Sequence, residues 1–482
     1  MPKNVLAFMQ IIALSLLASC VPMFEVAEPK KPLNVVVLLV DDLGWKDVGY
    51  MGSQFYETPH IDALAKQGMR FTQAYSSHPV CSPSRAAFIT GKDPVRLQIT
   101  DWIPGYTKAK SPILKTPPIR NELALEEVTL AEVFKASGYK TLFTGKWHLG
   151  EGEAFWPEHQ GFDVNIGGID RGAPPGGYFS PYKNPRLRDG PEGEFLTQRL
   201  GQETIGFIEE NSENPFLVYH SFYSVHTPIQ ADPKRIEHYQ DKAQKNDLNF
   251  ELESVGRYNG TSRSQQNDPA YASMVSAVDD VVGEIVATLE RLEILENTII
   301  VFASDNGGLS TGIETSKRRP TANLPLKAGK GWLYEGGIRT PLFIVSPTQI
   351  EAGSSSQAII RSVDILPTLV GMAQARNGLP EKVDGQDFTA HLQGGDGPEL
   401  EAYIWYFPHY HAAGWRPGYA VRSGKWKMIN HMETKEIELF DLEADPYETS
   451  NIATENPELI EKMQLLFDAW RADTGAILPQ PS

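Results

Sequence analysis

Four short apolar runs along the chain have the length and composition of buried strands. Residues 34–40 read NVVVLLV, and similar runs cover residues 215–220, 298–303 and 341–345. Runs that are apolar at nearly every position are typical of strands covered on both faces, as in a parallel sheet. The pattern therefore predicts a sheet buried between two layers of other structure.

Segments with apolar residues at spacings of three and four lie between these runs, as expected for helices that cover a sheet. They span residues 58–67, 129–137, 271–292 and 363–373. Strands and helices alternating over this length predict a doubly wound α/β domain. In such sheets, ligands bind beyond the carboxyl ends of the strands.

Acidic and amide residues follow two of the predicted strands. Asp41 and Asp42 come directly after the first run, and Asp305 and Asn306 follow the run that ends at residue 303. A single pair of this kind could be a solvated turn. Two pairs supply a cage of hard oxygen ligands, which suits Ca²⁺ or Mg²⁺ better than zinc or copper. We expect one Ca²⁺ ion, because calcium accepts crowded and irregular oxygen shells.

The pattern changes near residue 395 to short aromatic segments. They cover residues 402–407, 419–422, 426–429 and 437–442. A helical segment follows over about 457–471. Short strands with one helix predict a second, smaller subdomain built on an antiparallel sheet.

The first twenty residues have the order of an export signal. Lys3 precedes an apolar stretch from Val5 to Leu17, which is too short to span a membrane, and the sequence LASC then resembles a bacterial lipobox. Cleavage before Cys20 and its acylation would anchor the protein by lipid to a bacterial membrane, in the periplasm or at the cell surface. The alternative is an ordinary signal peptide in which Cys20 is incidental. Residues 21–32 are expected to form a tether.

Charge and cysteine content exclude two classes of protein. Lys and Arg total 44 against 61 Asp and Glu, a formal net charge of −17, which argues against a nucleic-acid-binding protein. An anionic substrate would therefore need a local basic pocket. Cys20 and Cys81 are the chain's two cysteines. A disulfide framework is thus excluded, and Cys81 has no partner cysteine if Cys20 is lipidated.

The segment around Cys81 resembles the signature of a known family. Residues 80–91 read VCSPSRAAFITG, which is similar to the CxPxR motif of the formylglycine-dependent sulfatases of the alkaline phosphatase-like superfamily. In that family a maturation enzyme reads the motif, here Pro83 and Arg85, and oxidises the cysteine to formylglycine (3-oxoalanine). The resemblance implies that modified Cys81 is the nucleophile and that Arg85 contacts it. A lone cysteine is more often a small buried thiol, but here the whole motif surrounds it.

Three further segments resemble family motifs that handle the sulfate group. TGKWHLG, residues 144–150, implies Lys146 as a sulfate ligand and His148 as a proton acceptor. SVHTP implies that His226 lies near the leaving oxygen, and AGKGWLYEGGIRTP implies that Lys330 bridges sulfate and leaving group. Alone, His226 would be an unremarkable loop histidine.

The resemblance also implies the metal ligands. SDNGG contains Asp305 and Asn306, which match the family's distal ligands and would bind calcium beside Asp41, Asp42 and modified Cys81. This set agrees with the oxygen cage predicted from the strand ends. The fold implied is a mixed sheet sandwiched by helices.

The predicted activity is hydrolysis of a sulfate ester by a catalytic domain over residues 33–394, with the subdomain over 395–482. Export as a lipoprotein favours a sulfated carbohydrate, such as an oligosaccharide from an algal or other polysaccharide, and the acidic chain favours exo action in a deep pocket. The Gly- and Pro-rich stretch 168–193 is expected to be a long loop over the site. Substrate contacts are expected from this loop and from the segment WYFPHYHAAGWRPG, namely Asp170, Arg171, Tyr178, His409, His411 and Arg416. Each could equally be a structural loop residue.

Three alternatives remain open. An arylsulfatase acting on small aryl sulfates would share every motif. A phosphoester or phosphonate hydrolase of the same superfold could use the same cage and basic cluster. A noncatalytic glycan-binding lipoprotein that kept the fold would retain substrate without releasing sulfate.

Overall fold

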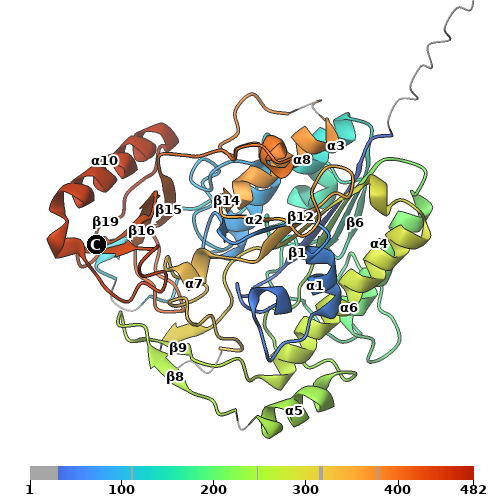
Figure 1. Ribbon diagram of the computed structural model, residues 1–482, viewed down its shortest axis with the longest axis horizontal. Coiled ribbons are helices and arrows are strands. Elements are labelled where there is room, and N and C mark those ends of the chain that lie inside the picture. The colour runs from blue at the N-terminus through green and yellow to red at the C-terminus, as the bar shows by residue number, and fades with distance from the viewer. Residues whose placement is uncertain (1–30, 110–111, 247, 314–318, 376, 378) are drawn as a thin grey trace, which may run out of the picture. The chain divides into compact units, whose positions relative to one another are not determined.

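A central sheet of eight strands organises the structure (Figure 1). In order across the sheet, the strands are β13 (Ser355–Ser356), β2 (Met69–Phe71), β12 (Leu342–Val345), β10 (Thr298–Ser304), β1 (Asn34–Val40), β7 (Phe216–Ser221), β5 (Lys140–Gly145) and β6 (Val164–Ile166). From β10 to β6 the strands run parallel, whereas β12 is antiparallel to β10 and to β2. The sheet is therefore mixed, as the family resemblance implied.

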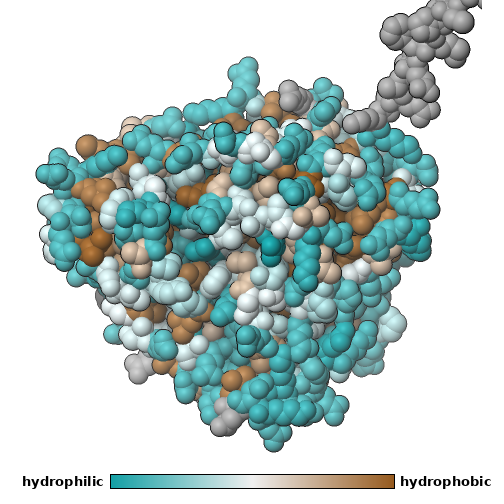
Figure 2. All heavy atoms as spheres, viewed as in Figure 1, coloured by the Kyte–Doolittle hydropathy of each residue, from teal (hydrophilic) through white to brown (hydrophobic). Residues whose placement is uncertain are grey.

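This computed structural model describes residues 31–482, apart from residues 110–111, 247, 314–318, 376 and 378. The predicted signal segment, Cys20 and most of the predicted tether lie outside the described residues. Among the residues described, no helix has both the length and the apolar character needed to cross a membrane. Polar side chains cover much of the face seen in Figure 2.

Strand β1 shows why the sheet is buried on both faces. Val35, Val37 and Leu39 pack into one hydrophobic core, and the alternate residues Val36 and Leu38 pack into the other. Successive side chains of a strand point to opposite faces, so a continuous apolar run serves two cores at once. All seven residues of β1 are buried.

Helices cover each face of this sheet (Figure 1). The first core contains residues of α2 (Cys81–Thr90), α3 (Leu130–Ala136) and α8 (Ile365–Ala373). The second contains residues of α1 (Pro59–Ala65), α4 (Leu196–Glu210) and the long α6 (Pro269–Arg291), against which α5 (Ile236–Lys245) also packs. The predicted layered α/β fold is confirmed.

The C-terminal region forms the predicted antiparallel sheet with one helix. Its strands are β15 (Tyr403–Phe407), β16 (Gly418–Ser423), β17 (Trp426–His431) and β18 (Glu436–Asp441), in that order. Helix α10 (Pro457–Thr474) lies against this sheet, with the Phe467 ring stacked on Tyr419 at 3.6 Å between centroids.

A smaller sheet lies beside the main one. It consists of β8 (Leu252–Ser254), β9 (Gly260–Arg263) and β11 (Thr311–Ile313), with β9 in the middle. The predicted loop over residues 168–193 has neither helix nor strand within the described chain, and α4 begins shortly after it.

A buried ion cluster joins the C-terminal sheet to α7 (Glu335–Ile338), the short helix that follows the Lys330 segment. The Lys427 ammonium lies 2.8 Å from Glu335 and 2.7 Å from Glu448, and all three side chains are at most 1% exposed. The cation therefore neutralises two carboxylates that have little access to water.

Replacing Lys427 with methionine is expected to destabilise the protein by about 3–5 kcal/mol, because two buried carboxylates would lose their cation. The thermal unfolding midpoint measures this loss. Lys425→Met on the same hairpin is the matched control, since Lys425 pairs with Asp441 at the surface. Equal midpoints for the two variants would contradict a stabilising role of the cluster.

Candidate active site

The two acidic pairs predicted from strand ends meet at one edge of the sheet. Val40 of β1 pairs in register with Ser304 of β10, so the residues that follow them lie side by side. The backbone N–H of Asp42 donates to Oδ1 of Asp305 at 3.1 Å, and the Asn306 amide donates to Oδ1 of Asp42 at 2.8 Å. The parallel pairing of β1 with β10 therefore brings the side chains of the predicted oxygen cage together.

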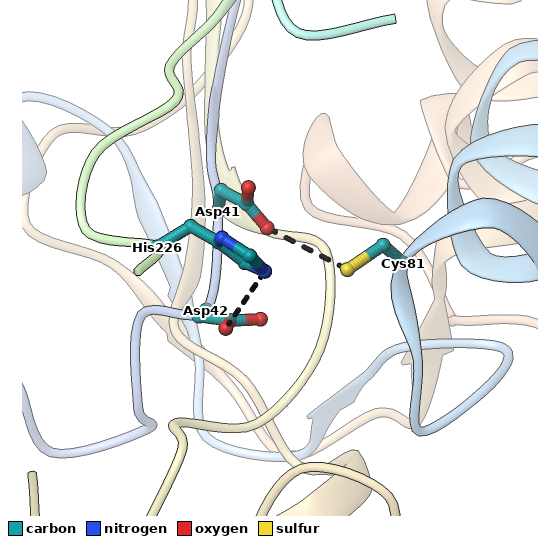
Figure 3. Close-up of side chains that lie close together, drawn as sticks. All are labelled: Asp41, Asp42, Cys81 and His226. Atoms are coloured by element: carbon teal, nitrogen blue, oxygen red, sulfur yellow. Dashed lines mark hydrogen bonds and ion pairs between the residues drawn. The ribbon is translucent and has the colours of Figure 1, made fainter. Parts of the chain in front are cut away.

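Cys81 faces this cage from the first turn of α2 (Figure 3). Its sulfur lies 3.7 Å from Oδ1 of Asp41 and 3.1 Å from the Lys330 ammonium. Asp41, Asp42, Cys81 and His226 each bring one ligand-type atom within 4.8 Å of the others. The first turn of the helix also directs free N–H groups toward this point, which favours a bound anion.

Arg85 lies one helical turn after Cys81 and is 2% exposed. Its Nε donates to Oδ2 of Asp305 at 2.8 Å, and its Nη1 donates to the Ser221 hydroxyl at 2.6 Å and to the Lys146 carbonyl at 2.9 Å. The other terminal nitrogen, Nη2, is buried without a hydrogen-bond partner in the described structure. Nη2 lies 3.6 Å from Oδ1 of Asp41, beyond hydrogen-bond distance, so its two N–H groups are available for an anion.

Two lysines complete the charge pattern. The Lys146 ammonium, directly after β5, lies 2.6 Å from Oδ2 of Asp41, and the Lys330 ammonium lies 2.6 Å from Oδ1 of Asp42. Together with Arg85, they place three cations against three carboxylates. With all three carboxylates ionised, the site is locally neutral, although the chain carries a net charge of −17.

Burial and these charges set the ionisation of the acids and the thiol. Burial raises the pKa of Asp41 to about 7, against the opposing effect of Lys146. Burial also disfavours ionised Asp42, but Lys330 and His226 hold its pKa below the usual range. Burial raises the pKa of the Cys81 thiol to about 11 despite the nearby lysines. An unmodified Cys81 would therefore be protonated at neutral pH, and a thiol is a poor nucleophile.

His148 is placed as a proton acceptor. Its Nε2 lies 2.8 Å from the Ile103 carbonyl, so Nε2 carries the proton of the neutral ring. The buried Nδ1 is left unprotonated, and none of the described residues hydrogen-bonds to it. Burial holds the pKa of His148 well below its usual range. The backbone of His148 has a φ of 59°, an uncommon conformation for a residue with a side chain.

His226 lies across Asp41 and Asp42 from Cys81 (Figure 3), and its side chain is partly exposed. Its Nε2 is 3.8 Å from Oδ2 of Asp42, and its Nδ1 is 2.8 Å from the Thr227 carbonyl. Burial lowers the pKa of His226 to about 3, so the ring is neutral in this structure. The Tyr178 hydroxyl donates to the backbone carbonyls of Tyr223 and His226, and it positions this loop.

The residues fit a hard divalent cation. Oδ2 of Asp42 and Oδ1 of Asn306 are buried oxygens without hydrogen-bond partners among the described residues. Leaving buried polar atoms unpaired is costly, which indicates that another group satisfies them. Carboxylate and amide oxygens are the ligands that Ca²⁺ and Mg²⁺ prefer.

A pocket of about 870 Å³ opens above Cys81. Of the predicted substrate contacts, Asp170, Arg171 and His411 line it, and Arg171 is exposed. The structure places the other three elsewhere. Tyr178 is fully buried, and its hydroxyl donates to the His226 carbonyl. His409 is buried against the Thr100 hydroxyl, and Arg416 pairs with Glu433 at 2.8 Å.

Sequence reasoning missed several residues of the pocket wall. Trp102, Glu151 and Thr311 line the pocket but stand in segments without a recognisable motif. The Trp102 segment is anchored on α2, because the Ile103 N–H donates to the Ser82 hydroxyl at 3.0 Å. An indole beside a polar pocket is a typical surface for a sugar ring, but one Trp in a loop gives no such signal in sequence.

Gly172 allows the loop to lie directly on His148. A Cβ atom at position 172 would lie 2.6 Å from Cε1 and 2.8 Å from Nε2 of the ring.

We expect Gly172→Ala to lower kcat by about a hundredfold, because displacing a catalytic group by about 1 Å has an effect of this size. Steady-state kinetics with an aryl sulfate measure it. Gly193→Ala in the same loop strains a backbone with a φ of 81° but places its Cβ within 4 Å of no atom, so it controls for general loop damage. Equal kcat values for the two variants would refute the proposed positioning.

The site and the fold agree with comparisons to known proteins. The sequence model described as Sulfatase matches residues 33–375, and the model described as N-sulphoglucosamine sulphohydrolase, C-terminal, matches residues 328–471. The chain therefore belongs to the sulfatase family, the sulfuric ester hydrolases. The resemblance found in the motifs is confirmed.

Individual relatives span most of the chain. N-acetylgalactosamine-6-sulfatase of Rattus norvegicus is 32% identical over 407 residues, which cover 79% of this chain and 68% of the relative. A sulfatase of Formosa agariphila is 28% identical over 99% of this chain and 96% of its own length. Among solved structures, Ps i-CgsB in complex with k-i-k-neocarrahexaose superposes with a TM-score of 0.74 at 27% identity, covering 92% of this chain and 94% of that chain.

Proposed function

We propose that this sulfatase removes sulfate from a sulfated carbohydrate, using a formylglycine made from Cys81 and one Ca²⁺ ion. The observation that carries the proposal is the meeting of Cys81, three cations and an incompletely satisfied oxygen cage at the floor of one pocket. The raised thiol pKa supports modification, because the unmodified side chain is ill suited to attack.

The residues that would hold Ca²⁺ are Asp41, Asp42, Asp305, Asn306 and the modified Cys81. When bound, the ion supplies positive charge that neutralises the sulfuryl oxygens and favours the ionised nucleophile. Three cations balance three carboxylates in the unliganded cluster, so a divalent cation would make the site net positive. This explains how an acidic protein can bind an anionic ester.

The chain's own residues divide the remaining work. Formylglycine is an aldehyde, and addition of one water would give two hydroxyls on one carbon, one to attack sulfur and one whose deprotonation would expel sulfate and restore the aldehyde. Arg85, Lys146 and Lys330 would hold the sulfuryl oxygens, and Nη2 of Arg85, which hydrogen-bonds to none of the described residues, is available for this contact. Nδ1 of His148 would accept the second hydroxyl proton, consistent with its unprotonated and unpartnered state.

Protonation of the leaving oxygen is assigned to His226, assisted by Lys330. The His226 ring is neutral in this structure, so it must gain a proton when the anionic substrate binds. A bound anion favours that protonated form. Lys330 remains charged, because Asp42 and Cys81 hold its pKa above the usual range although burial opposes this.

A carbohydrate substrate is favoured by the pocket and by the relatives. The pocket is large enough for a sugar ring, and Trp102, Asp170 and His411 supply an aromatic face and polar groups along its wall. One related protein is named for activity on N-acetylgalactosamine 6-sulfate, and the related structure holds a carrageenan oligosaccharide. We propose exo action on oligosaccharides from an algal or other polysaccharide.

A maturation enzyme and a lipid anchor complete the proposal. Pro83 and Arg85 would be read by the enzyme that converts Cys81, and Cys20 would carry the lipid that holds the protein at a bacterial membrane. Fractionation of wild-type and Cys20→Ala protein in the native host tests the anchor. Wild-type protein in the soluble periplasmic fraction would contradict it.

The activity is tested by comparing sulfate and phosphate esters of the same alcohol with one preparation. We expect kcat/KM to favour the sulfate ester by at least about a hundredfold, because the chain belongs to the sulfatase family. A preference for the phosphate ester would support the phosphoester or phosphonate hydrolase instead. Binding of glycans without release of sulfate would support a noncatalytic protein.

A further inference from the structure

A second cavity, of about 710 Å³, adjoins the catalytic pocket. Ala173 and Thr227 line both spaces. Thr227 directly follows His226, the residue proposed to lie near the leaving oxygen. The second cavity therefore lies on the side of the pocket toward which the alcohol part of the ester would extend.

Phe250 gives this cavity an exposed aromatic wall. Its side chain lines the cavity and is 54% exposed. The Arg263 guanidinium lies 5.0 Å from the centre of its ring, and Arg263 is itself held by hydrogen bonds to Asn267 and Asp268. The ring is therefore supported on one face by a fixed cation while much of its surface remains open.

The small sheet of β8, β9 and β11 carries further exposed apolar side chains. Leu252 of β8 and Ile313 of β11 are 38% and 42% exposed. Thr311 of β11 lines the catalytic pocket, and Arg263 of β9 lines the second cavity. Figure 2 shows apolar surface in the region of β8. One sheet thus links the reaction site to an exposed apolar surface.

We propose that the second cavity is a subsite for the sugar unit linked to the sulfated one, with Phe250 stacking on its ring. This inference rests on the proposed function and specifies its substrate as an oligosaccharide of at least two units. Sugar rings have an apolar face of C–H groups and a rim of hydroxyls, which match an aromatic ring next to a carboxylate. The Asp268 carboxylate, 28% exposed, lines the same cavity and can accept a bond from a hydroxyl.

The experiment compares Phe250→Ala with wild type on three kinds of substrate. These are 4-nitrocatechol sulfate, N-acetylgalactosamine 6-sulfate, and a panel of sulfated hexasaccharides from carrageenan, chondroitin and heparin. We expect Phe250→Ala to lower kcat/KM for a hexasaccharide by about tenfold, mainly through KM, and to leave the two smaller substrates within about twofold of wild type. Phe250→Tyr keeps the ring and should keep the wild-type values.

Leu465→Ala is the matched control, because Leu465 is a similarly exposed apolar residue on α10, in the C-terminal subdomain. If Phe250→Ala lowered kcat/KM equally for all three kinds of substrate, the proposed subsite would be overturned. It would also be overturned if wild-type protein turned over the small substrates but none of the hexasaccharides. Unchanged hexasaccharide kinetics in Phe250→Ala would also overturn it. Release of sulfate from none of the substrates by mature wild-type protein would instead refute the proposed function.

Discussion

Replacing Cys81 with alanine is expected to lower kcat for any sulfate ester by at least about 10⁴-fold, because the residue supplies the nucleophile. The change is small in volume, and Cys81 contacts Lys330 and Asp41 only through its sulfur, so the fold should persist. Initial rates of sulfate release, with the thermal unfolding midpoint as a check on folding, measure the effect.

Cys20→Ala is the matched control for this substitution, since it changes the chain's other cysteine. It should retain the wild-type kcat while altering membrane attachment. Substantial activity in folded Cys81→Ala protein would show that the nucleophile lies elsewhere and would refute the assignment of the site.

Removing the divalent cation with EGTA is expected to lower kcat by at least about 10³-fold, because the positive charge that the ion supplies would be lost from a buried site. Added Ca²⁺ should restore the rate, and it should raise the thermal midpoint because it binds only the folded protein. Metal content of dialysed protein, measured by mass spectrometry, should show about one calcium per chain.

Asn306→Ala tests the ligand set directly. This change removes a buried amide oxygen that has no other partner in the described structure, so the Ca²⁺ concentration needed for half-maximal activity should rise at least about tenfold. Asp280→Asn, in the separate cluster with His60 and Asp279, is the control and should not change it. Full activity of metal-free protein would contradict a metal-dependent mechanism.

The centre of the fold could be predicted from sequence because its signals are local. The run at residues 34–40 is strand β1 with the same bounds, and the other predicted strands and helices of the main sheet and its two covering layers differ from the structure by at most two residues at either end. The predicted C-terminal helix starts at the same residue as α10 but ends three residues earlier. Strand β5 was not predicted, because only Leu142 and Phe143 form an apolar pair between polar residues. Helix α4 was not predicted either. Its buried face includes Thr204, which bonds to His220 of β7, and a threonine gives no apolar signal.

The grouping of the motif and strand-end residues around Cys81 could be predicted from sequence, and the structure brings them together, whereas their catalytic roles stay predictions. The residues that line the pocket could not be predicted in this way. His409 and Arg416 are polar loop residues like His411, but their partners, Thr100 and Glu433, are identified only by the folded structure. Whether a loop residue faces a pocket or a neighbouring side chain depends on such tertiary contacts, which one sequence does not reveal.

The most direct test of the account is mass spectrometry of the tryptic peptide Phe71–Arg85 from protein made in its native host. Conversion of the Cys81 thiol to an aldehyde should lower the peptide mass by about 18 Da relative to the sequence, and the aldehyde should react with a hydrazide probe. Unmodified cysteine in protein that actively releases sulfate would contradict the formylglycine mechanism.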